Sequence, residues 1–214
     1  MMSSKSEKEV IDELRRDADE SAVLFSGRGK KNLEKRAVRG FLRALGVTFL
    51  EEELRSGHAE PIDVCFRDGR FQVTERLDLG GRPNLEWRQI AERRRNAMSL
   101  QQLVEPYTPS RAMGPDTVAK LVLEEATRKW RRYRSGCEQV DVLVYINLQG
   151  RHLYPTSPWP DFADFRQQGW RSVSLLVDRS GTVLFARTTA PKFLRLAVRQ
   201  TRQKWKWPEG LFDP

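Results

Sequence analysis

Three polar side chains that could hold a cation lie on either side of a short turn signal. Asp63 precedes the turn, and Gln72 and Thr74 follow it at alternate positions. Carboxylate and amide oxygens are ligands that Mg²⁺ accepts in proteins, and a bound Mg²⁺ both activates water and neutralises charge on a phosphate. If a hairpin brings the three residues together, they form a pocket suited to phosphodiester hydrolysis.

A β-hairpin over residues 62–77 is expected to position these side chains. Two apolar runs flank Asp68-Gly69, the preferred two-residue turn, and with these as central residues Asp63 pairs with Thr74. Side chains alternate along a strand, so one face holds Ile62, Val64, Phe66, Phe71, Val73 and Glu75, and the other holds Asp63, Cys65, Gln72, Thr74 and Arg76. The first face is a core face, and the second is either a polar site or a solvated sheet surface.

The segment Glu60-Pro61-Ile62-Asp63, followed after the turn by Phe71-Gln72-Val73-Thr74-Glu75, resembles the motif of the PD-(D/E)xK nucleases. The chain as a whole is also similar to a small, uncharacterised bacterial family described only as predicted endonucleases. The resemblance implies a restriction-endonuclease-like fold, a catalytic Mg²⁺ or Mn²⁺, and Asp63 as the first acidic ligand. Gln72 stands where the motif has its second acid, and Thr74 stands where it has a lysine.

The missing second carboxylate has several candidate sources. Glu75 lies one position beyond the motif, and by alternation it points to the apolar face unless a bulge rotates it. Glu60 lies just before the strand, and a preceding helix or loop offers Glu34, Glu51, Glu52 or Glu53. We therefore expect Asp63 and Gln72 as metal ligands, within a catalytic set that comprises Asp63, Gln72, Thr74, Glu75 and Glu60.

The chain is basic, with 38 Lys and Arg residues, 29 Asp and Glu residues and a net charge of +9. This excess is typical of proteins that bind polyanions, so the expected partner is nucleic acid, and the resemblance to nucleases implies DNA in particular. A helix over 190–206 would align five basic residues that recur at steps of three and four: Lys192, Arg195, Arg199, Arg202 and Lys206. Arg131 and Arg132 belong to a second basic cluster. Either set could instead be a solvated helix face.

Periodicity and turn signals predict the elements that carry these residues. Helices are expected over 6–24, 30–45, 84–103, 116–135, 161–168 and 190–206, and strands over 47–50, 62–66, 71–77, 140–148, 172–178 and 182–187. This order predicts an α/β fold with a mixed sheet of about five strands flanked by helices. We expect one domain over 1–214, with residues 1–27 as an N-terminal helical extension.

Several functional classes find no support in the sequence. No apolar run approaches the ~18 residues of a membrane span, and the N-terminus lacks the apolar core of a signal peptide. The two cysteines, Cys65 and Cys137, are far apart, so a cytoplasmic location is expected and a zinc site is not. Phosphate-binding loops, dinucleotide glycine patterns and nucleophile elbows are also missing.

Three interpretations remain open at this point. The first is a metal-dependent endonuclease acting on DNA. The second is a nucleic-acid-binding protein on the same fold that has lost catalysis, because Gln72 and Thr74 replace motif residues. The third is a protein-interaction or structural role with an incidental basic surface. The sequence does not indicate an oligomeric state.

Overall fold

The computed structural model describes residues 6–24, 26, 29–77, 83–104, 109–148, 150–154 and 158–203. Contacts divide the chain into a helical unit, Met1–Leu33 with Leu79–Pro109, and a sheet unit, Glu34–Asp78 with Ser110–Pro214. The expected single domain over 1–214, with an extension at 1–27, stays a prediction beside this division. The helical unit is larger because the segment after the hairpin packs against the first helix.

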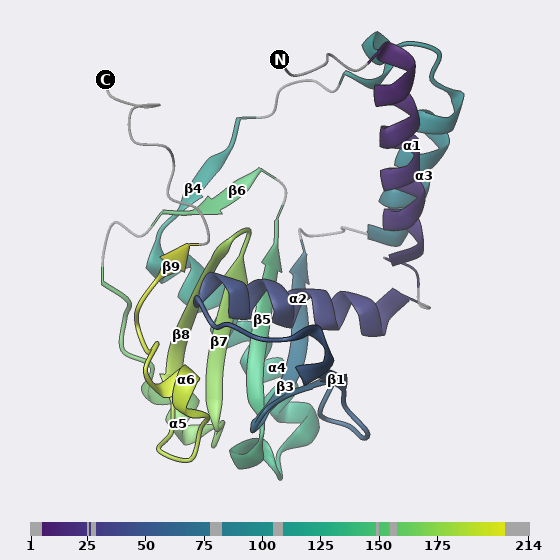
Figure 1. The fold of residues 1–214 in the computed structure, drawn as a ribbon. Helices are drawn as coiled ribbons and strands as arrows, with labels where there is room; N and C mark the ends of the chain where they lie inside the picture. The colour runs from purple at the N-terminus through teal and green to yellow at the C-terminus, as the bar shows by residue number, and fades with distance from the viewer. Residues whose placement is uncertain are drawn as a thin grey trace. The chain divides into compact units, whose positions relative to one another are not determined.

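The helical unit contains α1 (Glu7–Leu24), α3 (Pro83–Asn96) and the short 3₁₀ helix η3 (Leu100–Leu103). Its two long helices lie side by side (Figure 1). The side chain of Arg15 on α1 donates to the carbonyl oxygens of Arg94 and Ala97, at 3.1 and 2.8 Å. These carbonyls lie at the end of α3, where the helix predicted over 84–103 is interrupted, so Arg15 satisfies acceptors that helix termini leave unpaired.

The sheet unit is built on one mixed sheet, whose strands in the described residues are β1 (Leu54–Ser56), β2 (Val64–Phe66), β3 (Gly69–Leu77), β5 (Asp141–Asn147), β7 (Ser172–Val177), β8 (Ser180–Ala186) and β9 (Arg202–Gln203). They lie in that order, with β3, β5 and β7 parallel and the outer pairs antiparallel. The predicted α/β class with a mixed, helix-flanked sheet is confirmed. The sheet exceeds about five strands because the short β1 and β9 extend its edges.

Two helices cover the faces of this sheet, α2 (Lys30–Ala44) on one side and α4 (Pro115–Tyr133) on the other (Figure 1). The remaining elements are β4 (Arg111–Met113), β6 (Arg151–Leu153), α5 (Ala163–Gln167), α6 (Lys192–Arg195), η2 (Glu51–Glu53) and η4 (Cys137–Gln139). β4 and β6 pair in parallel as a separate small sheet. No helix within the described ranges is long and apolar enough to cross a membrane.

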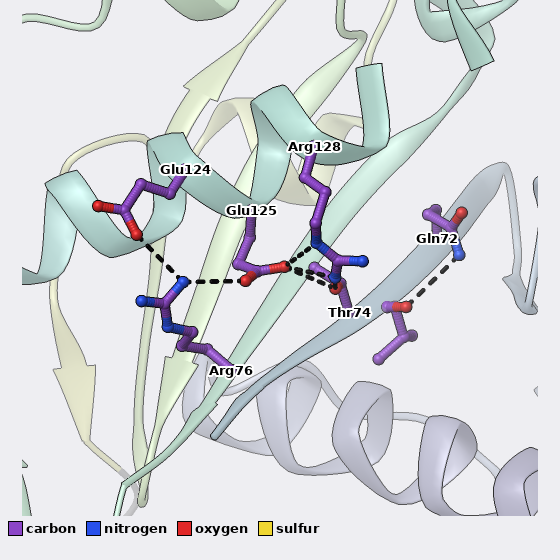
Figure 2. A network of polar contacts seen from close by, with 7 residues as sticks. Gln72, Thr74, Arg76, Glu124, Glu125 and Arg128 are labelled. Atoms are coloured by element: carbon purple, nitrogen blue, oxygen red, sulfur yellow. Dashed lines mark hydrogen bonds and ion pairs between the residues drawn. The ribbon is translucent and has the colours of Figure 1, made fainter. Parts of the chain in front are cut away.

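The alternation along β3 gives the two faces different chemistry. Phe71 and Val73 belong to the apolar cluster beneath α2, where Phe71 meets Phe41 edge to face at 6.2 Å between ring centroids. Gln72 and Thr74 leave the opposite face, toward α4 (Figure 2). The predicted division of the hairpin into an apolar and a polar face is therefore confirmed.

The hairpin register differs from the predicted one by two residues. Phe66 pairs with Gly69, so the two turn residues are Arg67 and Asp68, and Arg67 takes a positive φ of 52°. A Cβ on Gly69 would lie 2.9 Å from the Phe66 carbonyl oxygen, so glycine is required for close approach rather than for the turn. A shift of two preserves the faces and brings Asp63 opposite Gln72 instead of Thr74.

The predicted C-terminal helix over 190–206 is wrong. Of the described residues 190–203, only Lys192–Arg195 are α-helical, and Arg199 has a φ of 59° that no right-handed helix accepts. Val198 instead forms a parallel bridge with Val183 on β8, and the Arg199 amide donates to the Val183 carbonyl at 2.7 Å. Residues 198–199 therefore lie along the edge of the sheet, although the spacing of their basic neighbours predicted a helix with a cationic stripe.

A buried carboxylate joins the amino ends of the parallel strands. Asp141, fully buried at the start of β5, receives two hydrogen bonds from the guanidinium of Arg171 and one from the Ser172 hydroxyl at 2.7 Å. The main-chain amide of Arg70 on β3 also donates to it, at 2.9 Å. Asp141 therefore links β3, β5 and β7 at one level of the sheet.

Replacing Asp141 with Asn should destabilise the protein by about 3–5 kcal/mol, because Arg171 would keep a buried charge without its partner. Urea denaturation followed by circular dichroism measures the loss. The control is Glu138→Gln, an exposed neighbour, which should cost less than about 0.5 kcal/mol. Equal effects of the two substitutions would contradict this role for Asp141.

Candidate functional site

Asp63 lies directly before β2, and main-chain hydrogen bonds fix it on both sides. Its amide donates to the Phe71 carbonyl on β3 at 2.9 Å, and its own carbonyl accepts from the Gly57 amide at 2.8 Å. A Cβ on Gly57 would lie 1.8 Å from the Ile62 carbonyl oxygen, so no larger residue fits there. The tight loop between β1 and β2 therefore holds the Asp63 backbone against β3.

The Asp63 carboxylate turns toward β3 and contacts Gln72. Its Oδ2 accepts from the Val73 amide at 2.8 Å and from the side-chain amide of Gln72. Gln72 is 2% exposed, and its Oε1 has no hydrogen-bond partner among the residues that the structure describes. A buried amide oxygen left unsatisfied costs about 1–3 kcal/mol, and Gln72 Oε1 is such an unused acceptor, on the other side of the amide from the Asp63 contact (Figure 2).

Thr74 is closed off from solvent by α4. It is 4% exposed, its hydroxyl donates to Glu125 at 3.3 Å, and it accepts from the Arg128 guanidinium at 3.1 Å (Figure 2). Asp63, Gln72 and Thr74 do share one face of the hairpin, as the sequence predicts. Thr74 is nevertheless occupied by contacts with α4.

Glu125 is the centre of this polar network. It is 6% exposed and receives Arg128 at 2.6 Å and Arg76 at 3.1 Å, while Arg76 also reaches the exposed Glu124 at 3.0 Å (Figure 2). Burial alone would raise the pKa of the Glu125 carboxyl, but the hydrogen bonds from Arg128 and Arg76 outweigh it and hold that pKa below its ordinary value. Glu125 therefore stays ionised.

Glu60 lies near the end of α4 rather than on Asp63. Its carboxylate pairs with Arg132 at 3.0 Å, and both side chains are largely exposed. Burial raises the pKa of the neighbouring Tyr133, and the charges of Arg132, Glu60 and Asp63 all act on this phenol. The loop before β2 and the last turn of α4 therefore share one polar neighbourhood.

The structure places Glu75 on the opposite face, away from Asp63. The registers of β3 with β2 and with β5 run without a bulge, so alternation directs Glu75 to the side that α2 covers. There it accepts from the Asn147 amide at 2.9 Å, and burial raises the pKa of its carboxyl. Its expected place in the catalytic set is therefore not what the geometry supports.

Three of the four other acids considered, Glu34, Glu51 and Glu53, are also held elsewhere, and Glu52 is exposed. Glu34 is buried on α2, which covers the opposite face of the sheet. Glu51 pairs with Arg39 at 2.7 Å, and Glu53 pairs with Arg67 at 2.8 Å. Within the described ranges, no group of three or more His, Cys, Asp or Glu side chains is arranged to hold a metal ion. Glu125 and Glu60 form ion pairs with arginines and do not converge with Asp63 on a common metal position.

A family sequence profile matches residues 6–205, nearly the whole chain. Its description reads "Putative endonuclease, protein of unknown function (DUF1780)". The chain belongs to this DUF1780 family. The membership agrees with the endonuclease family that the sequence resembled, whereas the PD-(D/E)xK superfamily is not named by that description.

A solved structure shares the fold of this DUF1780 chain. It is a protein of unknown function from Pseudomonas aeruginosa strain PAO1 that is described as a member of the monooxygenase superfamily. The TM-score is 0.65 at 22% sequence identity, over 93% of this chain and 96% of the other. At that identity the likeness shows the fold alone. A comparison with curated proteins finds no match.

Within the part of the DUF1780 chain that the structure describes, the basic residues predicted to bind nucleic acid do not form one surface stripe. Arg195 donates to the Ala190 carbonyl at 3.1 Å, and Arg199 pairs with Asp161 at 2.7 Å. Lys192 lies on the short α6, the side chain of Arg202 is not described, and Lys206 lies outside the described residues. Arg131 and Arg132 remain exposed on α4.

Sequence reasoning missed Glu125, because its role depends on tertiary packing. The spacing of Glu125 and Arg128, three residues apart on a helix, is a visible signal for an ion pair. That spacing does not reveal that Thr74 and Arg76 meet the same carboxylate from β3. Only the packing of α4 on the polar face of the hairpin brings the four together.

Replacing Glu125 with Gln should lower stability by about 1–3 kcal/mol at neutral pH, because two arginines lose a buried charged partner. The control Glu124→Gln, 59% exposed, should cost less than about 0.5 kcal/mol. Urea denaturation of both variants and the wild type provides the comparison.

The stability gap caused by Glu125→Gln should close in acid. The folded-state pKa of Glu125 is lowered, so its stabilisation is complete above the unfolded pKa and is lost as the pH falls through the folded pKa. Denaturation curves at successively lower pH measure this. A gap that stays constant through the carboxyl range would show that the charge of Glu125 is not what stabilises the fold.

Proposed function

We propose that this chain hydrolyses phosphodiester bonds of DNA at Asp63, with Mg²⁺ or Mn²⁺ as its cofactor. The proposal includes a restriction-endonuclease-like arrangement of α2, the antiparallel strands β1, β2 and β3, α4 and β5. The observation that carries the proposal is the contact between the half-buried Asp63 carboxylate and the side-chain amide nitrogen of Gln72. The amide oxygen of Gln72 is a buried acceptor without a partner in the described residues. The description of the DUF1780 family supports the same activity.

Asp63 and Gln72 carry the types of ligand atom that a weakly held divalent cation accepts. Mg²⁺ and Mn²⁺ take oxygen ligands, and Asp63 offers a carboxylate while Gln72 offers an amide oxygen. With one charged ligand, affinity depends on water and substrate oxygens to complete the coordination. A cation bound there supplies Lewis acidity to the phosphate and a more acidic water molecule.

Arg128 is the residue of this chain best placed to supply positive charge at the position of the absent lysine. Its guanidinium donates to Thr74, which occupies that motif position, yet its side chain is 62% exposed. Glu125 fixes the orientation of this guanidinium through two hydrogen bonds, at 3.0 and 2.6 Å. We expect Arg128 to meet a phosphate oxygen while Asp63 orients the attacking water.

Asp63→Asn should reduce cleavage of plasmid or oligonucleotide DNA in Mg²⁺ or Mn²⁺ by at least about 100-fold, because the only charged ligand is lost. Gel electrophoresis of the products measures the rate. The control Asp178→Asn changes an exposed turn residue between β7 and β8 and should cleave like the wild type. Wild-type protein that leaves DNA intact at high enzyme excess would refute hydrolysis.

A second candidate is a nucleic-acid-binding protein that has lost catalysis on the same fold. The observation that favours it is the pairing of Glu125 and Glu60 with arginines, which leaves Asp63 as the one carboxylate turned to Gln72. This candidate predicts salt-dependent DNA binding by the wild type and no cleavage in either metal. Both candidates are consistent with a reducing, cytoplasmic location, since Cys65 and Cys137 are free thiols.

A further inference from the structure

Two cavities of the sheet unit adjoin one another at the amino ends of β5 and β7. One has a volume of about 680 Å³, and the other, beside the β2–β3 turn, has a volume of about 410 Å³. Arg70, Arg171 and Thr189 line both, so the two cavities are neighbours that share one wall. None of the basic residues singled out from the sequence lines either cavity.

Positive side chains dominate the lining of the two cavities. The basic lining residues besides Arg171 are Arg55, His58, Arg67, Arg70, Arg166 and Arg187. The only acids in the lining as the structure describes it are Asp68 and Glu138. We call this pair of cavities the arginine cleft.

Two arginines of the cleft keep their charge uncompensated by any carboxylate in the described structure. Arg70 donates to the side-chain oxygen of Gln139 at 3.2 Å. Arg187 donates to the carbonyl oxygens of Trp170 and Arg166, both at 3.0 Å. Neutral oxygens orient a guanidinium without cancelling its charge, so both side chains are prepared to receive an anion. Arg171 differs, because Asp141 neutralises it.

The arginine cleft borders the candidate site on the same face of the sheet. Arg55, Cys65 and Arg70 pair across β1, β2 and β3, and they line the smaller cavity. The next row on that face contains Asp63 and Gln72, two residues along each strand. At about 3.3 Å per residue the rows are about 7 Å apart, which suits neighbouring groups of one ligand.

We infer that the arginine cleft binds the sugar-phosphate backbone of the nucleic acid strand whose scissile phosphate lies at Asp63. This inference rests on the proposed function, because Asp63 defines where the strand is cut. A single phosphate is satisfied by one bidentate arginine, whereas cations spread over two adjoining cavities match a polyanion. The cleft therefore replaces the C-terminal stripe as the expected nucleic-acid surface.

The test measures how tightly the wild type and its variants bind a short fluorescein-labelled DNA strand, using fluorescence anisotropy at several salt concentrations. The variants are Arg70→Gln, Arg187→Gln and the double variant. Each single substitution should weaken binding several-fold at low salt. The double variant should lower the slope of log affinity against log salt by about 1–2, since each lost phosphate contact removes about 0.7–0.9. The matched control Arg43→Gln lies on α2, is paired with Glu51 at 3.4 Å, and should bind like the wild type.

Folding is controlled with the variants Arg70→Lys and Arg187→Lys, which keep the charge and should retain most of the affinity. Circular dichroism melting checks that every variant is folded. Lysine variants that bind as poorly as the glutamine variants, while remaining folded, would overturn a role for charge in the cleft.

The outcomes separate the cleft from the proposed activity. A wild type that binds DNA with an affinity the double variant leaves unchanged would overturn the cleft and leave the hydrolase proposal standing. Binding through the cleft without cleavage would overturn hydrolysis alone. Inorganic phosphate that displaces the labelled strand as well as unlabelled DNA does would show a site for one anion and overturn the polyanion assignment. A wild type that binds no DNA at low salt would overturn both.

Discussion

The buried pair of Asp141 and Arg171 is the interaction on which the sheet unit depends most. A fully buried carboxylate is tolerated only when its charge is met and its oxygens accept hydrogen bonds, and Asp141 receives them from Arg171, Ser172 and the Arg70 amide. Because Asp141 lies on β5, Arg70 on β3 and Ser172 on β7, with Arg171 directly before β7, these contacts fix the level at which the three strands meet. Arg171 also donates to the Asp68 carbonyl at 3.0 Å, so the same guanidinium holds the hairpin turn.

That placement has consequences for both polar regions of the sheet unit. A fixed turn sets the register of β2 against β3. In that register Cys65 lies opposite Arg70, and two residues further along the strands Asp63 lies opposite Gln72. On the same strand as Gln72, Thr74 and Arg76 form hydrogen bonds with Glu125, and these bonds hold α4 against β3. Because the charge of Glu125 is neutralised by its arginines, a nuclease site on this face depends on the negative charge of Asp63.

The sequence was informative wherever local periodicity decided the structure. The two faces of the hairpin were predicted correctly, although its register was wrong by two, because an even shift leaves alternation unchanged. The register was missed because Gly69 serves the close approach to Phe66 and not the turn itself. Tertiary contacts overrode local propensity at the C-terminus, where Val198 and Arg199 add to β8 despite helical spacing.

The arginine cleft could not be predicted from the sequence. The spacing of charges along one helix is a local property, whereas a cleft forms from residues of several strands. Arg55 and Arg70 come from β1 and β3, whereas Arg187 follows β8 more than 100 residues later, and the strand order brings the three to one edge. Arginines such as Arg39 and Arg132 pair with the carboxylates of Glu51 and Glu60, whereas Arg187 is held by neutral carbonyl oxygens and keeps its charge uncompensated within the described residues. The distribution of partners, more than the net charge of +9, is therefore the basis on which we expect an anion to bind in the arginine cleft.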